Sequence, residues 1–294
     1  MEAIILELKL VGGLGNQLHV VAAGYAISSL KSSPVSFDAR TIPFGSNPHR
    51  RLKVNELDLG FPISLKLSFA SPIFGYLNIL QRKLGLNLDN FLHDEEPDWR
   101  DNRSSPIEQI SLIPNHGKIE GHFLDFEWAE IASKYGFRFH GLKRPISKKI
   151  SAIRDEIDAE DVAIHARFGD YRKNQASFPL LGPDFYHRAL EIFTNARKVW
   201  LFTDDVRSAQ EILGDKILGR VLNVSKFGLS DVESFYLLTH FQRIVTANST
   251  YSTWAAFFAQ KNRGAEVITP TPHMFGEWKD QLPKSWLRLP AIDQ

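Results

Sequence analysis

Between residues 162 and 269, short apolar runs alternate with longer stretches that have helical spacing. The apolar runs are rich in β-branched and aromatic residues and predict strands at residues 162–166, 199–202, 221–223, 244–247 and 267–269. The stretches between them predict helices at residues 183–196, 206–213, 231–239 and 251–260, with Gly214 ending the second and Ser230 or Asp231 capping the third. Strands that alternate with helices indicate a parallel sheet covered on both faces.

The first half of the chain starts in the same way and then becomes less regular. A strand at residues 4–10, a helix at 17–30 and a strand at 35–37 form one strand–helix–strand unit. Residues 43–114 are richer in Pro, Asn and Asp, and the only helix predicted there covers residues 72–84. Further short strands are predicted at residues 118–120 and 137–139, and residues 143–158 resemble a linker that contains a helix.

A chain of 294 residues exceeds the usual size of a single domain. We therefore expect an α/β protein with two Rossmann-like domains, residues 1–150 and 151–294, that face a cleft. The C-terminal tail, with Trp278 and Trp286, is expected to pack back across the domains.

Composition excludes several classes of protein. The net charge of +1 gives no general attraction for nucleic acid, and the absence of cysteine excludes disulfides and thiolate metal sites. Residues 2–11 are too short and too charged to span a bilayer, and the absence of cysteine fits a reducing cytosol, so we expect a cytoplasmic protein. The basic run at residues 48–53 is either a solvated loop or a peripheral contact with anionic lipid.

The first strand is followed by a glycine-rich turn. Gly13 and Gly15 form half of a dinucleotide-binding fingerprint, and Asp38 lies where an NAD ribose would need an acid. However, Leu18 occupies the third glycine position, which the fingerprint needs for close helix packing. A tight turn explains the glycines, but it does not explain the two amides Asn16 and Gln17, which are candidates for ligand binding at the helix start.

A second motif follows the strand at residues 162–166. His165 and Arg167 share one face of this strand, and the guanidinium fork of arginine matches phosphate oxygens. Gly169 permits a close approach of the backbone. Asp170 either caps a turn or acts on the substrate. His165 is either a hydrogen-bonded core residue or a catalytic one, and Arg167 binds either a phosphate or Asp170.

Two further strand ends carry polar residues. Thr203, Asp204 and Asp205 follow one strand, and one acid is expected to accept hydrogen bonds from a ribose or a base while the other caps the next helix; capping alone is the alternative. No Asp-x-Asp triplet occurs in the chain. The run from Asn248 through Ser249 and Thr250 to Tyr251 precedes a helix, where N–H and O–H donors either hold a phosphate or form an ordinary cap.

These segments resemble those of the α-1,2-fucosyltransferases of glycosyltransferase family 11. The matching segments are Gly12–Gln17, His165–Tyr171, Phe202–Asp205 and Asn248–Trp254, with weaker similarity at Gly121–Phe123, 233–238 and 267–270. The chain departs from the family pattern at Phe168, where the family has a second arginine, at Leu18 and His19, and at Thr253. One cation near the expected diphosphate is therefore missing.

The resemblance implies a fold of the GT-B type, in which the C-terminal half binds GDP-β-L-fucose and the N-terminal half binds the acceptor. It implies inverting transfer of L-fucose to O2 of a β-galactoside in a surface glycan, with no metal or other cofactor. Arg167 and Ser249–Tyr251 would stabilise the leaving diphosphate. Asp170 and His165 are candidates for the base, and Asn16 could hold the acceptor hydroxyl.

The acceptor would be a galactose-containing glycan, free or lipid-linked, and any membrane contact would be peripheral, at the inner surface. Three alternatives remain open at the level of the sequence. The protein transfers another GDP-deoxysugar, or it is an NAD-dependent oxidoreductase that uses Gly13, Gly15 and Asp38. The third alternative is a nucleotide-binding or lectin-like module without turnover.

Overall fold

The computed structural model describes residues 5–40, 42, 51–67, 97–102, 104–169, 178–218, 221–275 and 281–291. The chain divides into two units, Met1–Phe137 and Arg138–Gln294, so the boundary lies before the position near residue 150 that the sequence suggested. Each unit is built on a parallel sheet, which confirms the α/β class with two Rossmann-like units. Within the described residues, no helix is both long and apolar enough to cross a bilayer.

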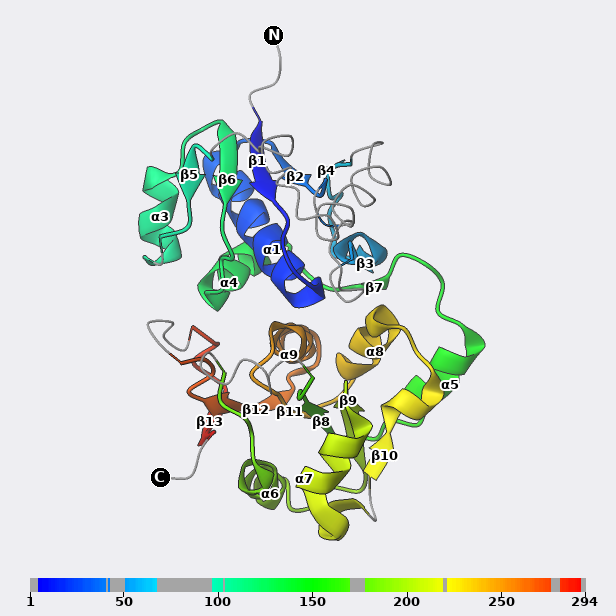
Figure 1. Ribbon diagram of the computed structural model, residues 1–294. Helices are drawn as coiled ribbons and strands as arrows, with labels where there is room; N and C mark the ends of the chain where they lie inside the picture. Colours follow the sequence, from blue (N-terminus) through cyan, green and yellow to red (C-terminus); the bar gives the residue numbers. More distant parts are fainter. Residues whose placement is uncertain are drawn as a thin grey trace, which may run out of the picture. The chain divides into compact units, whose positions relative to one another are not determined.

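The first unit contains a five-stranded sheet in the order β4-β2-β1-β6-β5, with every described pairing parallel (Figure 1). Its strands are β1 (Leu6–Lys9), β2 (Val35–Asp38), β4 (Leu65–Lys66), β5 (Trp99–Arg100) and β6 (Gly117–Glu120), and a short β3 covers Leu57–Asp58. Its helices are α1 (Leu14–Lys31), α3 (Pro106–Leu112), α4 (Phe126–Lys134) and a 3-10 turn at Val54–Glu56.

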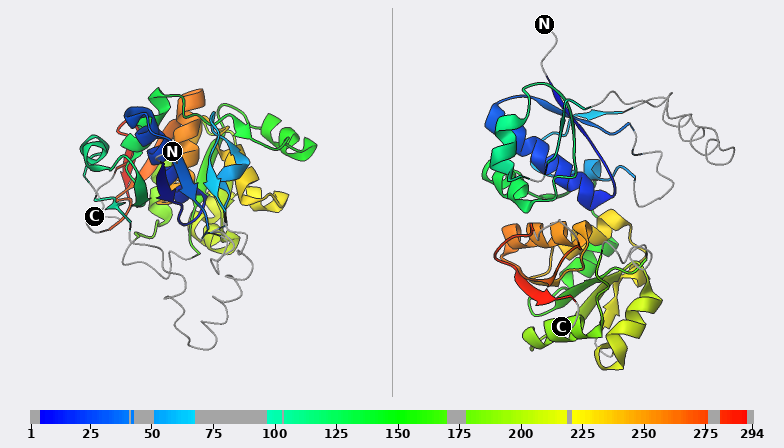
Figure 2. Two further views of the ribbon diagram at one scale, coloured as in Figure 1. Left: turned by 90° about the horizontal axis from the view of Figure 1, so that it is seen from above. Right: turned by 60° about the vertical axis from the view of Figure 1, so that its left-hand side comes forward.

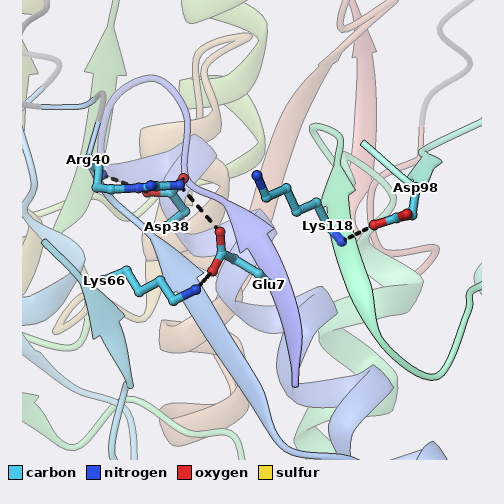
Figure 3. A network of polar contacts seen from close by, with 6 residues as sticks. All are labelled: Glu7, Asp38, Arg40, Lys66, Asp98 and Lys118. Atoms are coloured by element: carbon cyan, nitrogen blue, oxygen red, sulfur yellow. Dashed lines mark hydrogen bonds and ion pairs between the residues drawn. The ribbon is translucent and has the colours of Figure 1, made fainter. Parts of the chain in front are cut away.

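The two faces of this sheet differ because the side chains of β1 alternate. Leu6 and Leu8 are fully buried with α1, and Gly24 lets the helix come close: a Cβ at this position would lie 2.7 Å from the Phe37 ring. Thus a glycine inside α1 gives the close helix–sheet packing that Leu18 cannot. The opposite face is charged, with Glu7 on β1 in contact with Lys66 and Arg40 (Figure 3).

The second unit contains a six-stranded parallel sheet in the order β10-β9-β8-β11-β12-β13. Its strands are β8 (Val162–Ala166), β9 (Val199–Thr203), β10 (Val221–Asn223), β11 (Arg243–Val245), β12 (Glu266–Thr271) and β13 (Leu287–Pro290), and a short β7 covers Gly141–Leu142. Its helices are α5 (Lys148–Asp155), α6 (Pro183–Ile192), α7 (Val206–Leu218), α8 (Asp231–Leu238) and α9 (Thr250–Arg263), with a 3-10 turn at Val224–Phe227. Within this unit, α6 and α7 cover one face of the sheet and α8 and α9 cover the other (Figures 1 and 2).

The C-terminal tail belongs to the second unit. Its strand β13 extends the sheet beside β12, and Trp286 Nε1 donates to Gln260 Oε1 of α9 over 3.0 Å. Residues 281–291 of the tail therefore pack on the second unit, and the expected packing across both domains stays a prediction. Trp278 lies outside the described residues.

The structure corrects two predicted elements, and a third lies outside the described residues. Residues 137–139 are not a strand: Phe137 packs with Tyr25 and Phe61 in the first unit, whereas Phe139 packs on Phe235 and Phe258 in the second. Their alternation reflects burial in two separate cores. Helix α7 continues through Gly214 to Leu218, since a glycine inside a helix costs only about 1 kcal/mol. The helix predicted at residues 72–84 is the one outside the described residues.

Candidate functional site

The order of strands in the second unit locates a crevice for ligands. The chain runs from β8 through β9 to β10 on one side, and then crosses to β11 on the other side of β8. In open α/β sheets, ligands bind outside the carboxyl ends of strands where the order reverses in this way. The end of β8 lies beside the start of α9, which follows β11: the ring centroids of His165 in β8 and Tyr251 in α9 are 5.4 Å apart. Two of the predicted motifs are therefore side by side.

Arg167 follows β8 and is held by an acid at the end of the neighbouring strand β9. Its Nε lies 3.2 Å from Asp204 Oδ2. The same carboxylate accepts the backbone N–H groups of Phe168 and Gly169, each over 3.0 Å. Asp204 is thus an ion-pair partner of Arg167. Asp170, which the sequence offered as the alternative to a phosphate for Arg167, lies outside the described residues, so that pairing stays a prediction.

The side chain of Phe168 points away from the face that carries Arg167. It is 1% exposed and belongs to the core formed with Phe185 and Tyr186 of α6. This placement follows from the alternation of side chains along an extended segment. Phe168, one of the positions at which the chain departs from the pattern it resembles, therefore fills the core beneath the sheet.

His165 is a buried, neutral residue in this structure. Burial, with the positive charge of Arg167 as a smaller cause, lowers the pKa of His165 to about 3. Its Nδ1 is fully buried and has no hydrogen-bond partner among the described groups. An imidazole with so low a pKa holds a proton poorly near neutral pH, which is unfavourable for a general base.

We expect the protein to lose stability as the pH falls from about 6.5 towards 3. His165, and His240 with a pKa lowered to about 4 mainly by burial, stay neutral when folded but take up protons when unfolded. The unfolded state then binds more protons, so acid favours it, by at most about 1.4 kcal/mol per pH unit for each group. Urea unfolding at several pH values should show a smaller acid slope for His165→Gln. An unchanged slope would contradict the conclusion that His165 is neutral in the folded protein.

Thr203 and Asp205, at the end of β9, form hydrogen bonds with neighbouring residues of the chain. Asp205 accepts the backbone N–H of Ser208 over 3.1 Å and its hydroxyl over 2.6 Å, which is the geometry of an N-cap for α7. Thr203 Oγ1 accepts the N–H of Asp205 over 3.2 Å. These contacts favour a role for Thr203 and Asp205 in starting α7.

The start of α9 provides the second part of the site. Asn248 is 2% exposed, and its side chain donates to Pro179 O over 2.7 Å. This bond ties the segment before α9 to the segment before α6. Ser249 is the N-cap, but its side chain makes no capping hydrogen bond to the 14-residue helix that begins at Thr250. Tyr251 donates to Asp231 O over 2.7 Å. A helix N-terminus without a side-chain cap suits an anion.

The first motif lies in the first unit, at the start of α1. Gly12 has φ +67°, and a Cβ there would lie 2.6 Å from Asn16 Nδ2. Gly13 is the N-cap of α1, and Gly15 is buried in its first turn. The strand order reverses at β1: β2 and β4 lie on one side of it, and the later strands β6 and β5 lie on the other. The motif after β1 therefore also lies at a switch point.

Gln17 is completely buried, and its amide is fully occupied by backbone groups. Its Nε2 donates to Gly12 O over 3.0 Å and to Arg51 O over 2.7 Å. Its Oε1 accepts from Lys53 N over 3.0 Å and Val54 N over 3.1 Å. These four bonds use the hydrogen-bonding capacity of a glutamine amide. The residue that the sequence proposed for ligand binding instead ties the segment 51–54 to α1.

Asp38 already accepts hydrogen bonds from Arg40, which weakens the NAD alternative. Arg40 donates to its carboxylate from the backbone N over 2.9 Å, from Nε over 2.8 Å and from Nη2 over 2.7 Å (Figure 3). Although burial favours the neutral acid, the hydrogen bonds and charge of Arg40 leave the pKa of Asp38 below its ordinary value. A ribose would have to compete with this ion pair.

One buried group beside the site was not indicated by any sequence pattern. Tyr186 of α6 is fully buried, and its hydroxyl has no hydrogen-bond partner in the described part of the chain. Burial, and then the negative charge of Asp204, raise the pKa of Tyr186. Only the packing of α6 under β8 and β9 brings it near the site.

Among the described residues, no three His, Asp or Glu side chains are grouped as metal ligands.

Comparison with known proteins gives matches along most of the chain. The chain is 27% identical to an α-1,2-colitosyltransferase of Escherichia coli, over 97% of its own length and 99% of that protein. It is also 27% identical to the O-antigen biosynthesis glycosyltransferase WbnK of Escherichia coli, over 45% of each chain.

Two solved fucosyltransferases overlay loosely on the structure. NodZ from Bradyrhizobium covers 87% of this chain and 93% of its own, with 12% identity and a TM-score of 0.48. The Arabidopsis thaliana FUT1 mutant R284K in complex with GDP covers 94% of this chain and 72% of its own, with 12% identity and a TM-score of 0.49. The sequence profile of glycosyl transferase family 11 matches residues 76–288. The chain belongs to glycosyl transferase family 11.

Proposed function

We propose that this protein transfers a deoxysugar from a GDP-sugar to O2 of a β-galactoside in a glycan, with inversion at the anomeric carbon. L-fucose is the first candidate for the transferred sugar. Colitose is the second, because the relative that matches nearly the whole chain is named an α-1,2-colitosyltransferase. The second unit would bind the donor, and the first would bind the acceptor.

One observation carries this proposal. A fixed arginine, Arg167, and the start of α9 at Ser249 follow the two strands, β8 and β11, that flank the switch point of the second unit. Both features favour an anion, the first by charge and the second by its N–H groups. A diphosphate is an anion that can accept hydrogen bonds from both kinds of group.

The same groups suit the chemistry of the transfer. The acceptor oxygen forms a bond to the anomeric carbon as the bond from that carbon to the diphosphate oxygen breaks. The electron pair of the broken bond leaves with GDP, so negative charge grows on the β-phosphate. Donors that are already in position stabilise such charge most effectively. The acceptor proton passes to a base, for which Asp170 and His165 are the candidates; burial lowers the pKa of His165 to about 3, which makes it a weak base.

We expect GDP to raise the melting temperature and NAD to leave it unchanged. GDP at 100 times its dissociation constant should stabilise the protein by about 2.7 kcal/mol, because it binds only the folded state. The measurement is thermal unfolding with GDP, GMP, NAD and free L-fucose in parallel. Stabilisation by NAD alone would favour the oxidoreductase, and stabilisation by a free sugar alone would favour a lectin.

The reaction is tested by incubation with GDP-L-fucose, GDP-colitose and GDP-mannose, each with a panel of β-galactosides. Products are then identified by mass and glycosidic linkage. A 1,2-linked fucosyl or colitosyl product supports the proposal and separates the two donors. Tight GDP binding without any transfer would support a non-catalytic nucleotide-binding protein.

Activity is expected to survive EDTA. The chain has no Asp-x-Asp triplet, and Arg167 is a fixed cation that can take the place of a metal at the diphosphate. The measurement is turnover after dialysis against EDTA, with and without added Mn²⁺. Complete loss that Mn²⁺ restores would mean that Asp204 or Asp205 binds a metal with the donor.

A further inference from the structure

We propose that Asp204 is a positioning residue that acts through Arg167, and that it makes no direct contact with the donor. This inference rests on the proposed function, since it assigns a role within the same donor site. It replaces the sequence-based expectation that an acid at this strand end accepts hydrogen bonds from a ribose or a base.

The contacts of Asp204 are directed to the protein. Its Oδ1 accepts Phe168 N–H over 3.0 Å, and its Oδ2 accepts Gly169 N–H over 3.0 Å and lies 3.2 Å from Arg167 Nε. The carboxylate that follows β9 thus holds the backbone N–H groups of Phe168 and Gly169 and the guanidinium of Arg167. Three donors on two oxygens leave little capacity for a ligand.

The glycine at position 169 is part of this arrangement. A Cβ on Gly169 would lie 2.6 Å from Asp204 Oδ2, closer than such atoms approach in folded proteins. Any other residue there would push the carboxylate away from Arg167 or displace the turn. The need for glycine is steric at this position, and it arises from Asp204.

The surroundings of Asp204 strengthen its hold on Arg167. Phe168 and Tyr186 lie in the apolar core under the ends of β8 and β9, each with no more than 1% of its surface exposed. The side chains of Arg167 and Asp204 are themselves only 23% and 19% exposed. Opposite charges attract more strongly beside a low-dielectric core than in water. The ion pair therefore orients the guanidinium before any ligand arrives.

The role predicts an unusual split in the kinetics of Asp204→Asn. The Oδ1 atom of an asparagine can still accept the Phe168 N–H. Its Nδ2 would face Gly169 N–H and Arg167 Nε, where it cannot accept a hydrogen bond and carries no negative charge. The misplaced guanidinium should lower kcat by on the order of 100-fold, the loss that a misplacement of about 1 Å can cause. GDP affinity should stay within about threefold or become tighter, because Arg167 keeps its charge and loses its internal counter-ion.

Binding of GDP and of inorganic pyrophosphate, measured by calorimetry, separates the alternatives. If Asp204 contacts the nucleoside, Asp204→Asn weakens GDP and leaves pyrophosphate unchanged, which would overturn the proposal. Unchanged kcat would overturn it as well. Asp158→Asn is the matched control, because it breaks another Arg–Asp pair, in which Asp158 Oδ2 lies 2.9 Å from Arg197 Nη1 near the start of β8. It should leave kcat, the affinity for GDP and the affinity for pyrophosphate unchanged.

A double-mutant cycle tests whether Asp204 acts through Arg167. In an Arg167→Ala background, Asp204→Asn should change kcat by less than about threefold, because the residue it positions is already gone. Independent, multiplicative losses would overturn the proposal. If Asp204→Asn does not fold, Gly169→Ala provides the test, with the same fall in kcat and retained GDP affinity expected.

The ion pair also has a signature that needs no ligand. In protein labelled with ¹⁵N-arginine, the Nε–H signal that disappears in Arg167→Lys should exchange slowly with solvent. Asp204→Asn should lose this protection, and a signal that stays protected would overturn the proposal. If the parent protein does not bind GDP, the proposed function fails, and the role of Asp204 is judged by this signal alone.

Discussion

Arg167→Ala should lower the rate of transfer by roughly 100-fold or more, while the affinity for GDP falls much less. A donor fixed where charge develops typically contributes about 3 kcal/mol to the transition state. Arg167 is in place before the reaction, since Asp204 Oδ2 lies 3.2 Å from its Nε. Its contribution should grow as the bond to the diphosphate breaks, so the loss appears in kcat.

Arg167→Lys distinguishes charge from geometry at this position. Lysine keeps the positive charge but loses the planar fork, so kcat should remain well below that of the parent protein. Arg197→Ala is the matched control, because this arginine pairs with Asp158 on an exposed surface of the same unit. A folded Arg167→Ala protein that turns over within a few-fold of the parent would show that the motif is structural.

Gln17→Leu should lower the stability of the protein by about 3 kcal/mol. The change leaves four backbone groups, two carbonyls and two N–H groups, without the partners that the amide now provides. A buried polar group that loses its partner costs about 1–3 kcal/mol, and part of this cost is recovered by water at the loop. Thermal unfolding should show a fall in Tm of roughly 10 °C.

The matched control is Gln210→Leu, the same chemical change at an exposed position of α7. It should shift stability by less than about 0.5 kcal/mol. Hydrogen exchange adds a local measurement, since the N–H groups of Lys53 and Val54 should lose protection in Gln17→Leu. Retained protection there, with unchanged Tm, would show that the bonds of Gln17 are dispensable.

Some features could be read from the sequence because they depend on neighbours along the chain. The regular alternation after residue 162 gave the strands β8 to β12 and the helices between them. Helix α3 was missed, although Ser105, Pro106 and Glu108 form a capping box with proline at the first helical position. That signal is local, and it was present in the sequence.

Other features depended on which strands are neighbours. Arg167 pairs with an acid that follows β9, and the amide of Gln17 binds backbone groups of residues 51–54, which are 34 or more positions along the chain. Neither pairing leaves a local pattern. The alternation of Phe137 and Phe139 resembled a strand, but it arises from burial in two different units.

The sequence by itself determined the α/β class, the family and the strand ends at which polar residues gather, because periodicity and short motifs express local geometry. Only the tertiary structure decided the roles of particular residues. It brought Asp204 to Arg167, turned Phe168 into the core and buried His165 so that its pKa falls to about 3. The physical reason is that burial and ion pairing are set by the order of the strands in the sheet, which brings together residues that are distant in the chain.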